Sequence, residues 1–288
     1  MAATSDAGRA GSGVGSEHQG LGTHAGGGGR WRIWRRADEV DYRPHRLRAL
    51  WNSTIGKKYV VAITGVIFAI WVTLHMLGNL KEIEGPGAGN PAIDQYAKWL
   101  RTLLSPGLPH DFVLWIIRGI LIVSVVLHIV ANYQLWQRNR KAKPTGHRGQ
   151  RVRSTWAART MTTSGIIILA FLVFHILHFT TGTIHPTKLI SGAVYSNMYY
   201  AFHLWWLVVI YVLAMALLGA HMFHGLWSAA QTTGVDNPDR NWFWRRLGAT
   251  VALIVAVGFA SMPLAIAFGA FAKPIHPHTR PGAAQNLG

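Results

Sequence analysis

Five long apolar segments dominate this sequence. Each has about 20 residues or more, which is enough for an α-helix to cross a hydrocarbon core of about 30 Å. Inside lipid every backbone polar group needs an internal partner, so segments of this kind fold as helices. We therefore predict an all-α, polytopic membrane bundle with five transmembrane helices, which we place at 59–80, 112–137, 160–180, 199–230 and 247–272.

Basic residues are distributed unevenly among the connections. They precede the first segment and fill the second and fourth loops, whereas the first and third loops are nearly neutral. Because cytoplasmic loops carry the excess of Lys and Arg, we expect the N-terminus in the cytoplasm and the C-terminus outside. Topology thus accounts for the net charge of +17, and we expect contact with membrane lipid and none with nucleic acid. A docking surface for a cytoplasmic partner is the alternative use of these charges.

The ends of the chain differ from its apolar middle. Residues 1–45 are rich in Gly, basic towards their end, and lack the apolar core of a secretory signal, so we expect a disordered tail that is not cleaved. Residues 46–272 form the predicted transmembrane domain, and residues 273–288 form a short external tail.

Cysteine is absent from the sequence. The chain therefore forms no disulfide and offers no thiolate ligand. An iron–sulfur cluster could be held here only with cysteines from another subunit.

Four histidines lie inside four different apolar segments. At about 1.5 Å per helical residue, His75 and His175 both lie about 25 Å from the cytoplasmic boundary, and His128 and His221 both lie about 15 Å from it. Two levels separated by about 10 Å are what two stacked b-type haems with paired histidine ligands require. A single intramembrane histidine can also be a polar group that a neighbouring helix satisfies. Four histidines that match in depth favour one shared role, and binding of haem iron is such a role.

Two glycines fit this interpretation. Gly65 and Gly165 each lie ten residues before the outer-level histidine of their own segment, which places them close to the inner level. A helix without a side chain there lets a flat macrocycle approach, although small residues also serve plain helix packing in membranes.

Further polar residues lie near the two levels. His178 and His224 each follow a proposed ligand by three residues, so each is either the true ligand or a partner of a haem propionate; His175 and His221 are preferred as ligands. Arg118, inside the second segment, is a candidate partner for a propionate or a snorkelling side chain. Candidates for hydrogen bonds around the cofactors are Thr64, Thr163, Ser164 and Asn79.

Several motifs resemble a known family. The segments "STIGKKYVVAITGVIFAIWVTLHMLGNLK", "LHIVANYQLW", "ARTMTTSGIIILAFLVFHILHF" and "HMFHGLWSAAQTTG", together with "DQYAKWL", occur in the order found in the cytochrome b subunit of succinate dehydrogenase, or respiratory complex II, in its single-chain, five-helix form. The resemblance spans about residues 53–238. The long Gly-rich tail and the terminal "KPIHPHTRPG" depart from the family without touching the proposed ligands.

This resemblance implies a function. It implies a multi-pass anchor in the bacterial cytoplasmic membrane, without flavin of its own, for the flavoprotein and iron–sulfur subunits of a succinate:quinone oxidoreductase of the tricarboxylic acid cycle. The family's axial positions fall on His128 with His221 for one haem b and on His75 with His175 for the other. The substrate at the membrane would be menaquinone or ubiquinone.

Candidates for quinone binding lie near the expected cytoplasmic side. Arg48, Trp51, Ser53 and Arg159 offer aromatic surface and hydrogen-bond donors. All four are also residue types that anchor helices at the headgroup level. Asp94, in the first outer loop, is either a proton relay for an outer quinone site or a solvated acid.

Other functions remain open from the sequence. One is a di-haem quinone cytochrome of another dehydrogenase, and another is a proton-coupled transporter, which would be expected to show internal repeats or broken helices. A third is a structural anchor without a cofactor. The membrane centre could also be a different metal site, such as an iron–sulfur cluster completed by partner cysteines.

Overall fold

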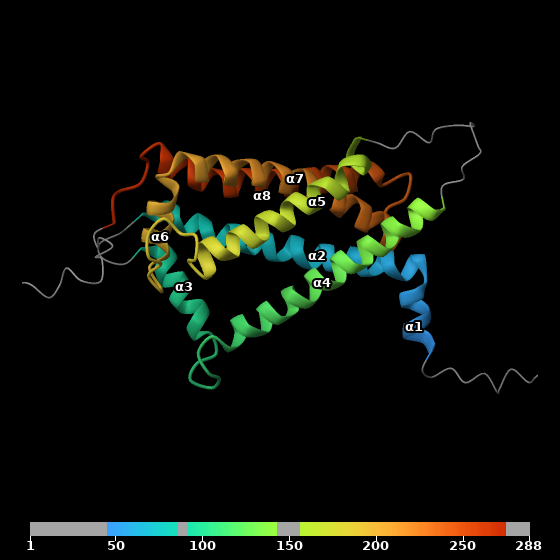
Figure 1. The fold of residues 1–288 in the computed structure, drawn as a ribbon, viewed down its shortest axis with the longest axis horizontal. Helices are drawn as coiled ribbons and strands as arrows, with labels where there is room; N and C mark the ends of the chain where they lie inside the picture. Colours follow the sequence, from blue (N-terminus) through green and yellow to red (C-terminus); the bar gives the residue numbers. More distant parts are fainter. Residues whose placement is uncertain (1–44, 86–90, 143–155, 275–288) are drawn as a thin grey trace, which may run out of the picture. The chain divides into compact units, whose positions relative to one another are not determined.

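The computed structural model describes residues 45–85, 91–142 and 156–274, without the side chains of 45–47 and 156–159. The two predicted tails therefore lie almost entirely outside the described residues. The helices (Figure 1) are α1 (His45–Asn52), α2 (Thr54–Asn79), α3 (Ala92–Thr102), α4 (Phe112–Lys141), α5 (Trp156–His175), α6 (Val194–Phe202), α7 (Trp205–Thr233) and α8 (Asn241–Ala267). A 3-10 turn, η2 (Leu80–Glu84), continues α2, and a π-helical turn, η3 (Ile176–Thr180), continues α5.

Five of these helical stretches are long and apolar enough to cross a membrane. They are Thr54–Glu84, Phe112–Lys141, Thr160–Thr180, Trp205–Thr233 and Asn241–Ala267. No strand occurs in the described ranges. The prediction of an all-α bundle with five spans is therefore confirmed, while the direction in which the helices cross the membrane stays a prediction. We call the end where α2 begins and α4 ends the basic end, because Lys57, Lys58 and Arg138 lie there, and the other end the opposite end.

The fourth predicted segment is not one helix. The continuous helix expected at 199–230 is broken between α6 and α7, where Leu204 adopts an extended conformation with φ −90° and ψ 106°. Neither Gly nor Pro marks the break in the sequence. The reason is tertiary: Tyr195 and Phe202 of α6 are buried in the same apolar cluster as Tyr211 of α7, which turns α6 back onto the bundle.

The fifth segment is shifted from its predicted position. It was expected at 247–272, but α8 begins at Asn241 and ends at Ala267. The helix includes Arg245 and Arg246 because a helix can continue past the lipid boundary with charged side chains at its end. The chain leaves the helix before Gly269, whose φ of +75° favours a residue without a Cβ atom.

The corner between α1 and α2 has a local cause. The Ser53 hydroxyl accepts a hydrogen bond from the Gly56 N–H at 2.7 Å, which caps the first turn of α2. Gly56 is required there, because a Cβ atom at that position would collide with the Leu50 carbonyl group. The buried Lys57 ammonium donates to the Trp51 carbonyl and lies 5.0 Å from the centre of the Trp51 ring.

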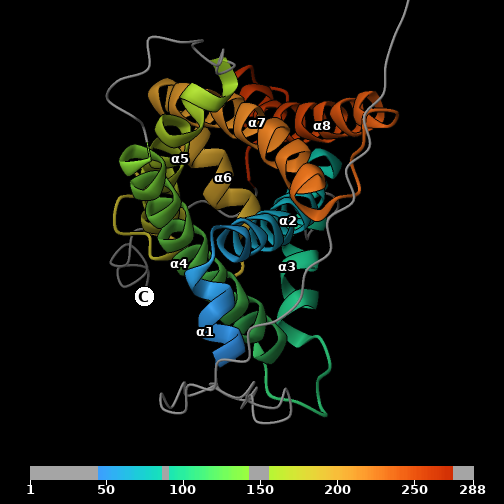
Figure 2. The same cartoon turned by 90° about the vertical axis from the view of Figure 1, so that its right-hand side faces the viewer.

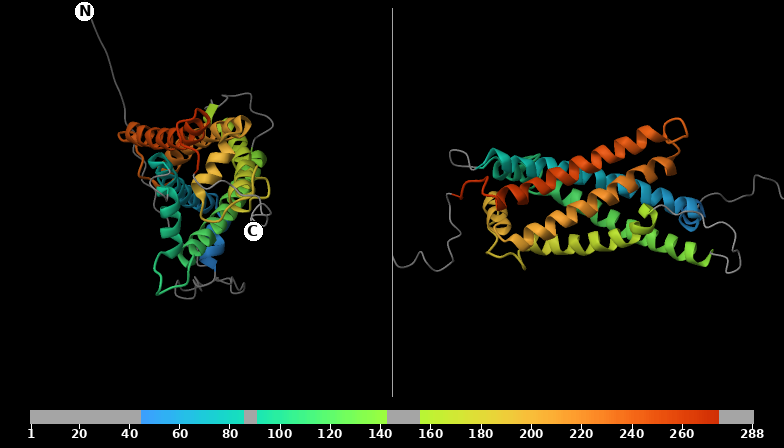
Figure 3. Two further views of the ribbon diagram at one scale, coloured as in Figure 1. Left: turned by 90° about the vertical axis from the view of Figure 1, so that its left-hand side faces the viewer. Right: turned by 90° about the horizontal axis from the view of Figure 1, so that it is seen from above.

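The helices α2 and α7 lie at the centre of the bundle, and α8 packs against both of them. α2 packs against α4 on one side and against α7 on the other, and α7 also packs against α5 and α8 (Figure 2). Figure 3 shows α7 and α8 running side by side as a hairpin. Close approach of these two helices depends on Gly219, where a Cβ atom would lie 2.9 Å from that of Ala256.

Most large apolar side chains of the spans face outward, as lipid contact requires. Ile122 and Val123 of α4 and Leu253 and Val257 of α8 are all exposed. The helices α4 and α5 are the least buried of the five spans. Much of their surface is therefore free for lipid, a cofactor or a partner chain.

Candidate functional site

The His128 side chain packs against α2 beside Thr64 and Gly65. Its Nδ1 atom lies 2.8 Å from the Thr64 hydroxyl, and its Cε1 atom lies 3.7 Å from the point where a Cβ atom on Gly65 would be. The Thr64 hydroxyl donates its only proton to the Val60 carbonyl at 2.7 Å, so it accepts from Nδ1–H of the imidazole. The Nε2 atom of His128 is then the basic nitrogen, which is the one that can bind a metal.

His221 repeats this arrangement on the other side of the bundle. Its Nδ1 atom lies 3.1 Å from the Ser164 hydroxyl, and its Cε1 atom lies 3.5 Å from a Cβ position on Gly165. Ser164 donates to the Met161 carbonyl at 3.0 Å, so it too accepts from the imidazole. The Nε2 atom of His221 is therefore also left as the basic nitrogen.

The two helix pairs, α2 with α4 and α5 with α7, thus carry the same local pattern. In each pair the first helix has a hydroxyl residue followed by glycine, and a histidine of the second helix contacts both of these residues. A Cβ atom on Gly65 or Gly165 would lie beside the imidazole of His128 or His221 and not beside another helix backbone. The role of these glycines toward a cofactor stays a prediction.

His75 and His175 form the second histidine pair. Their ring centres lie 6.1 Å apart and their planes are inclined by 80°. Two imidazoles that bind one metal ion from opposite sides, each at about 2.0–2.1 Å, have ring centres about 6 Å apart. The other neighbours of His75 are the rings of Trp71 and Phe259, at 5.8 and 5.6 Å.

Tyr211 of α7 connects two histidines near this second level. Its hydroxyl lies 3.3 Å from Nδ1 of His175 and 2.8 Å from Nδ1 of His178. A phenol has one proton, so it donates to one of these imidazoles and accepts from the other. If it donates to His178 and accepts from His175, Nε2 of His175 is the basic nitrogen; the reverse leaves Nε2 of His178 basic. The ring contact with His75 belongs to His175, which favours the first arrangement.

The other candidates from the sequence have different surroundings. His178 is fully buried, and its ring centre is 5.0 Å from that of His185. His224 contacts Phe223 and lies within electrostatic range of Arg245. Arg118 is exposed, and its guanidinium lies 4.8 Å from the ring centre of Trp115 on the same helix.

The four candidates for quinone binding differ in the contacts that their side chains already make. Ser53 is occupied as the cap of α2, and Trp51 lies beneath the Lys57 ammonium. Arg48 is exposed on α1, and the side chain of Arg159 lies outside the described residues. The structure therefore leaves Arg48 free and gives Ser53 a structural role.

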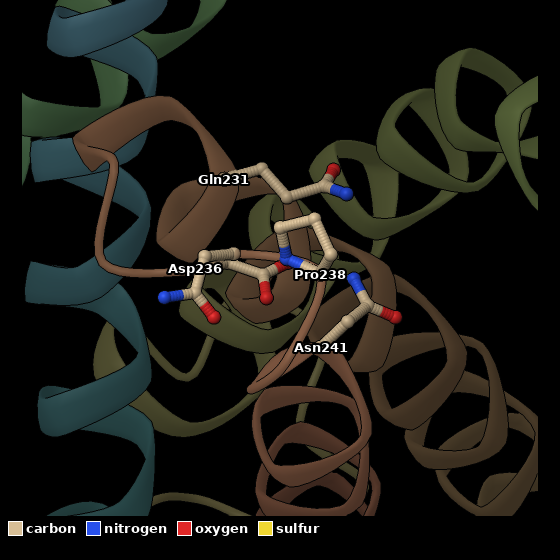
Figure 4. A pocket seen from close by; sticks show the side chains of 5 residues that line it. Gln231, Asp236, Pro238 and Asn241 are labelled. Carbon is tan, nitrogen blue, oxygen red and sulfur yellow. Dashed lines mark hydrogen bonds between the residues drawn. The ribbon is translucent and has the colours of Figure 1, made fainter.

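A separate pocket of about 540 Å³ lies at the basic end, in the turn between α7 and α8. It is lined by Gln231, Asp236, Asn237, Pro238 and Asn241. In Figure 4 the amide side chains of Gln231 and Asn241 extend on either side of Pro238. One oxygen of Asp236 accepts from Asn241 at 2.8 Å and from the Trp227 indole at 3.2 Å. None of the paired histidines lines this pocket, whose first lining residue lies ten residues beyond His221 in the sequence.

Sequence reasoning missed Tyr211 as a partner of the histidines. A signal was present, because Tyr211 precedes His221 by ten residues, the spacing that separates Gly65 from His75. It also missed Glu82, whose burial follows only from the packing around η2.

The number of possible ligand side chains that lie together indicates which kind of cofactor they could hold. Within the described ranges no group of three or more His, Cys, Asp or Glu side chains is placed to hold a metal ion. Pairs of histidines suit a metal whose remaining ligands come from a macrocycle or from another chain.

Compared with models of protein families, with curated proteins and with solved structures, the chain has no match.

Proposed function

We propose that this chain is the membrane anchor and electron-transfer subunit of a succinate dehydrogenase. The observation that carries the proposal is the arrangement of four histidines as two facing or matched pairs, with three of them oriented through Nδ1 by Thr64, Ser164 and Tyr211. The choice of succinate, and of a flavoprotein and an iron–sulfur partner, comes from the family resemblance of the sequence motifs.

In this proposal the inner pair, His128 and His221, would hold one haem b, and the outer pair, His75 and His175, would hold the second. When bound, haem supplies one-electron redox chemistry. The chain half-buries all four imidazoles, and it orients His128, His175 and His221 through Nδ1 so that Nε2 would be available as the ligand atom. Quinone would bind at the basic end, where Arg48 provides an exposed cationic group and Trp51 an aromatic surface.

The basic end also fits a cytoplasmic partner. The described part of the chain places Arg138, Arg140 and Lys141 there, while Arg240 lies in the turn before α8 and Arg245 and Arg246 lie near the start of α8. An iron–sulfur subunit with an acidic face would meet this surface and bring its cluster nearest to the His128 and His221 level. Exposure of α4 and α5 supports an assembly with further chains.

The first test is an optical spectrum, reduced minus oxidised, of the purified complex, with haem quantified per chain. We expect two haems in the wild type and the loss of one in each of His128→Ala and His175→Ala. His203→Ala is the matched control, because His203 is exposed and its Nδ1 bonds only the Tyr199 carbonyl at 2.7 Å.

Other results would change the proposal. A complex that oxidises succinate without haem would keep the anchor function and point to an iron–sulfur cluster completed by partner cysteines. Purification with a different dehydrogenase would replace the substrate but keep the paired ligands. A chain with neither redox centre nor partner would overturn the proposal.

A further inference from the structure

Arg118 of α4 is a charged side chain on an apolar, exposed surface. It lies six residues beyond Phe112, the first residue of α4, or about 9 Å into the helix. Trp115 and Ile122 lie three residues before it and four residues after it, so they share its side of the helix, and they are 65% and 63% exposed. Arg118 is itself exposed. A guanidinium that is always charged therefore lies on a surface that is otherwise suited to lipid.

No acidic side chain neutralises Arg118 in the described part of the chain, where the only ion pair joins Lys81 and Glu84. The nearest acid along α4 is Asp111, which precedes Arg118 by seven residues. The contact that Arg118 does make is with the Trp115 ring, whose centre lies 4.8 Å from the guanidinium carbon. Because a charge in apolar surroundings is costly, this position favours an anion from outside the chain.

The contact with Trp115 shows which way the Arg118 side chain runs. Trp115 lies one turn closer to the start of α4, so the guanidinium is directed back toward the opposite end of the bundle. A long side chain near the end of a span reaches the headgroup level in this way. The flat face of the guanidinium lies over the ring, which leaves its N–H edge free. That edge matches two oxygens of a phosphate group.

A second pair of tryptophan and arginine marks the other end of α4. Trp136 is exposed, and the Arg140 guanidinium lies 4.7 Å from its ring centre. Trp115 and Trp136 are 21 residues apart, or about 30 Å along a helix, which is the thickness of a hydrocarbon core. Tryptophan gathers at both membrane interfaces, so this spacing puts Trp115 at the headgroup level and Arg118 about 4.5 Å inside it. Lipid phosphates are the anions nearest to that depth.

We propose that Trp115 and Arg118 form a binding site for the phosphate group of a phospholipid in the leaflet at the opposite end. Arg118 donates hydrogen bonds to the phosphate oxygens, Trp115 holds the guanidinium at the interface, and Ile122 contacts an acyl chain of the same lipid. The site does not depend on the proposed function. An arginine occupied in this way is not the partner of a haem propionate.

The test is native mass spectrometry of the purified protein, with the subunits that purify with it, after lipid is removed and phosphatidylglycerol is titrated back. We expect Arg118→Gln to lower the affinity for one phosphatidylglycerol molecule by about 10-fold, the size of a lost hydrogen bond to a charged group. Arg118→Lys keeps the charge and should lose less. Lys188→Gln is the matched control, because Lys188 is an exposed cation outside the apolar helices, and it should bind like the wild type.

Further probes identify the source of the anion. Phosphatidylcholine, whose headgroup keeps the phosphate without a net charge, should compete with phosphatidylglycerol. Diacylglycerol with the same acyl chains should not compete, and neither should inorganic phosphate alone. Competition by diacylglycerol would overturn the phosphate contact, and competition by inorganic phosphate would overturn the role of the lipid.

The same titration separates this proposal from the proposed function. Equal affinity of Arg118→Gln and the wild type for phosphatidylglycerol would overturn the site. If that variant instead changed the optical spectrum of a bound haem, a propionate would be the partner of Arg118. A protein without haem would contradict the proposed function and leave the lipid titration readable.

Discussion

At the scale of single residues, the orientation of the histidines depends on small hydroxyl groups. Thr64 and Ser164 each use their proton on a backbone carbonyl of their own helix and accept from an imidazole of the next helix. Each hydroxyl therefore selects the tautomer in which Nε2 is the basic nitrogen. Groups of this kind tune both the ring orientation and the basicity of a metal ligand.

Removing these hydroxyls tests their role. We expect Thr64→Val and Ser164→Ala to weaken cofactor retention at the His128 and His221 level by about 10–100-fold, the usual effect of losing a group that orients a metal ligand. The measurement is the haem content after dialysis against apomyoglobin. Thr73→Val is the control, because the Thr73 hydroxyl bonds only the Ala69 carbonyl of its own helix, at 2.7 Å. Equal retention in all three variants would contradict the role of the hydroxyls.

At the scale of helices, close packing is concentrated between α7 and α8. Gly219 lies where the two helices approach most tightly, whereas Gly225, on the same helix, has no described atom within 4 Å of its Cβ position. The two glycines are thus a matched pair that differs in its surroundings.

Alanine at these two positions should have opposite effects. Gly219→Ala places a methyl group 2.9 Å from the Ala256 Cβ atom, and we expect such overpacking to lower the free energy of unfolding by about 1–3 kcal/mol. Gly225→Ala should raise it by about 0.5–1 kcal/mol, because glycine is a poor residue for a helix interior. Thermal unfolding of both variants in the same detergent measures these changes. Equal shifts in the same direction would show that the close α7–α8 contact does not limit the stability of the fold.

The link between α3 and α6 should depend on pH. The pKa of Asp94 is raised in the folded chain, so between its ordinary value of 3.8 and that raised value the folded state binds more protons than the unfolded state. Stability is then lost as pH rises through this window. Asp94→Asn removes the effect, and its amide oxygen can still accept from the Tyr195 N–H.

We therefore expect the melting temperature of Asp94→Asn, relative to the wild type, to increase as pH rises from about 4 to 7. Asp239→Asn is the control, because Asp239 is exposed in the turn before α8. A difference between Asp94→Asn and the wild type that does not vary with pH would contradict the raised pKa of Asp94.

At the scale of the whole molecule, the positive-inside rule makes a prediction about sidedness. The basic end should face the cytoplasm, and the turn around Lys188 should face outward. Because the chain has no cysteine, maleimide labelling of a single-cysteine variant has no background from other cysteines of this chain. Lys188→Cys should react with a membrane-impermeant maleimide on intact cells, and Asp239→Cys should react only after the membrane is opened. The reverse pattern would invert the topology and place the His128 and His221 level away from a cytoplasmic partner.

The sequence by itself determined the number and type of the membrane segments. A spanning helix satisfies its backbone hydrogen bonds internally, so its existence follows from the length and apolarity of one continuous segment. The expected depth of a residue follows from the same local geometry, so counting residues is enough to predict two levels, one for His75 with His175 and one for His128 with His221.

The tertiary structure decided what those residues touch. The facing rings of His75 and His175, the Tyr211 bridge and the burial of Glu82 all join helices that are distant in the sequence. The break before α7 likewise arises from packing of α6 and has no Gly or Pro to announce it. Such contacts depend on which helices become neighbours and how they rotate. Those choices are made by side-chain packing between segments, and no local pattern encodes them.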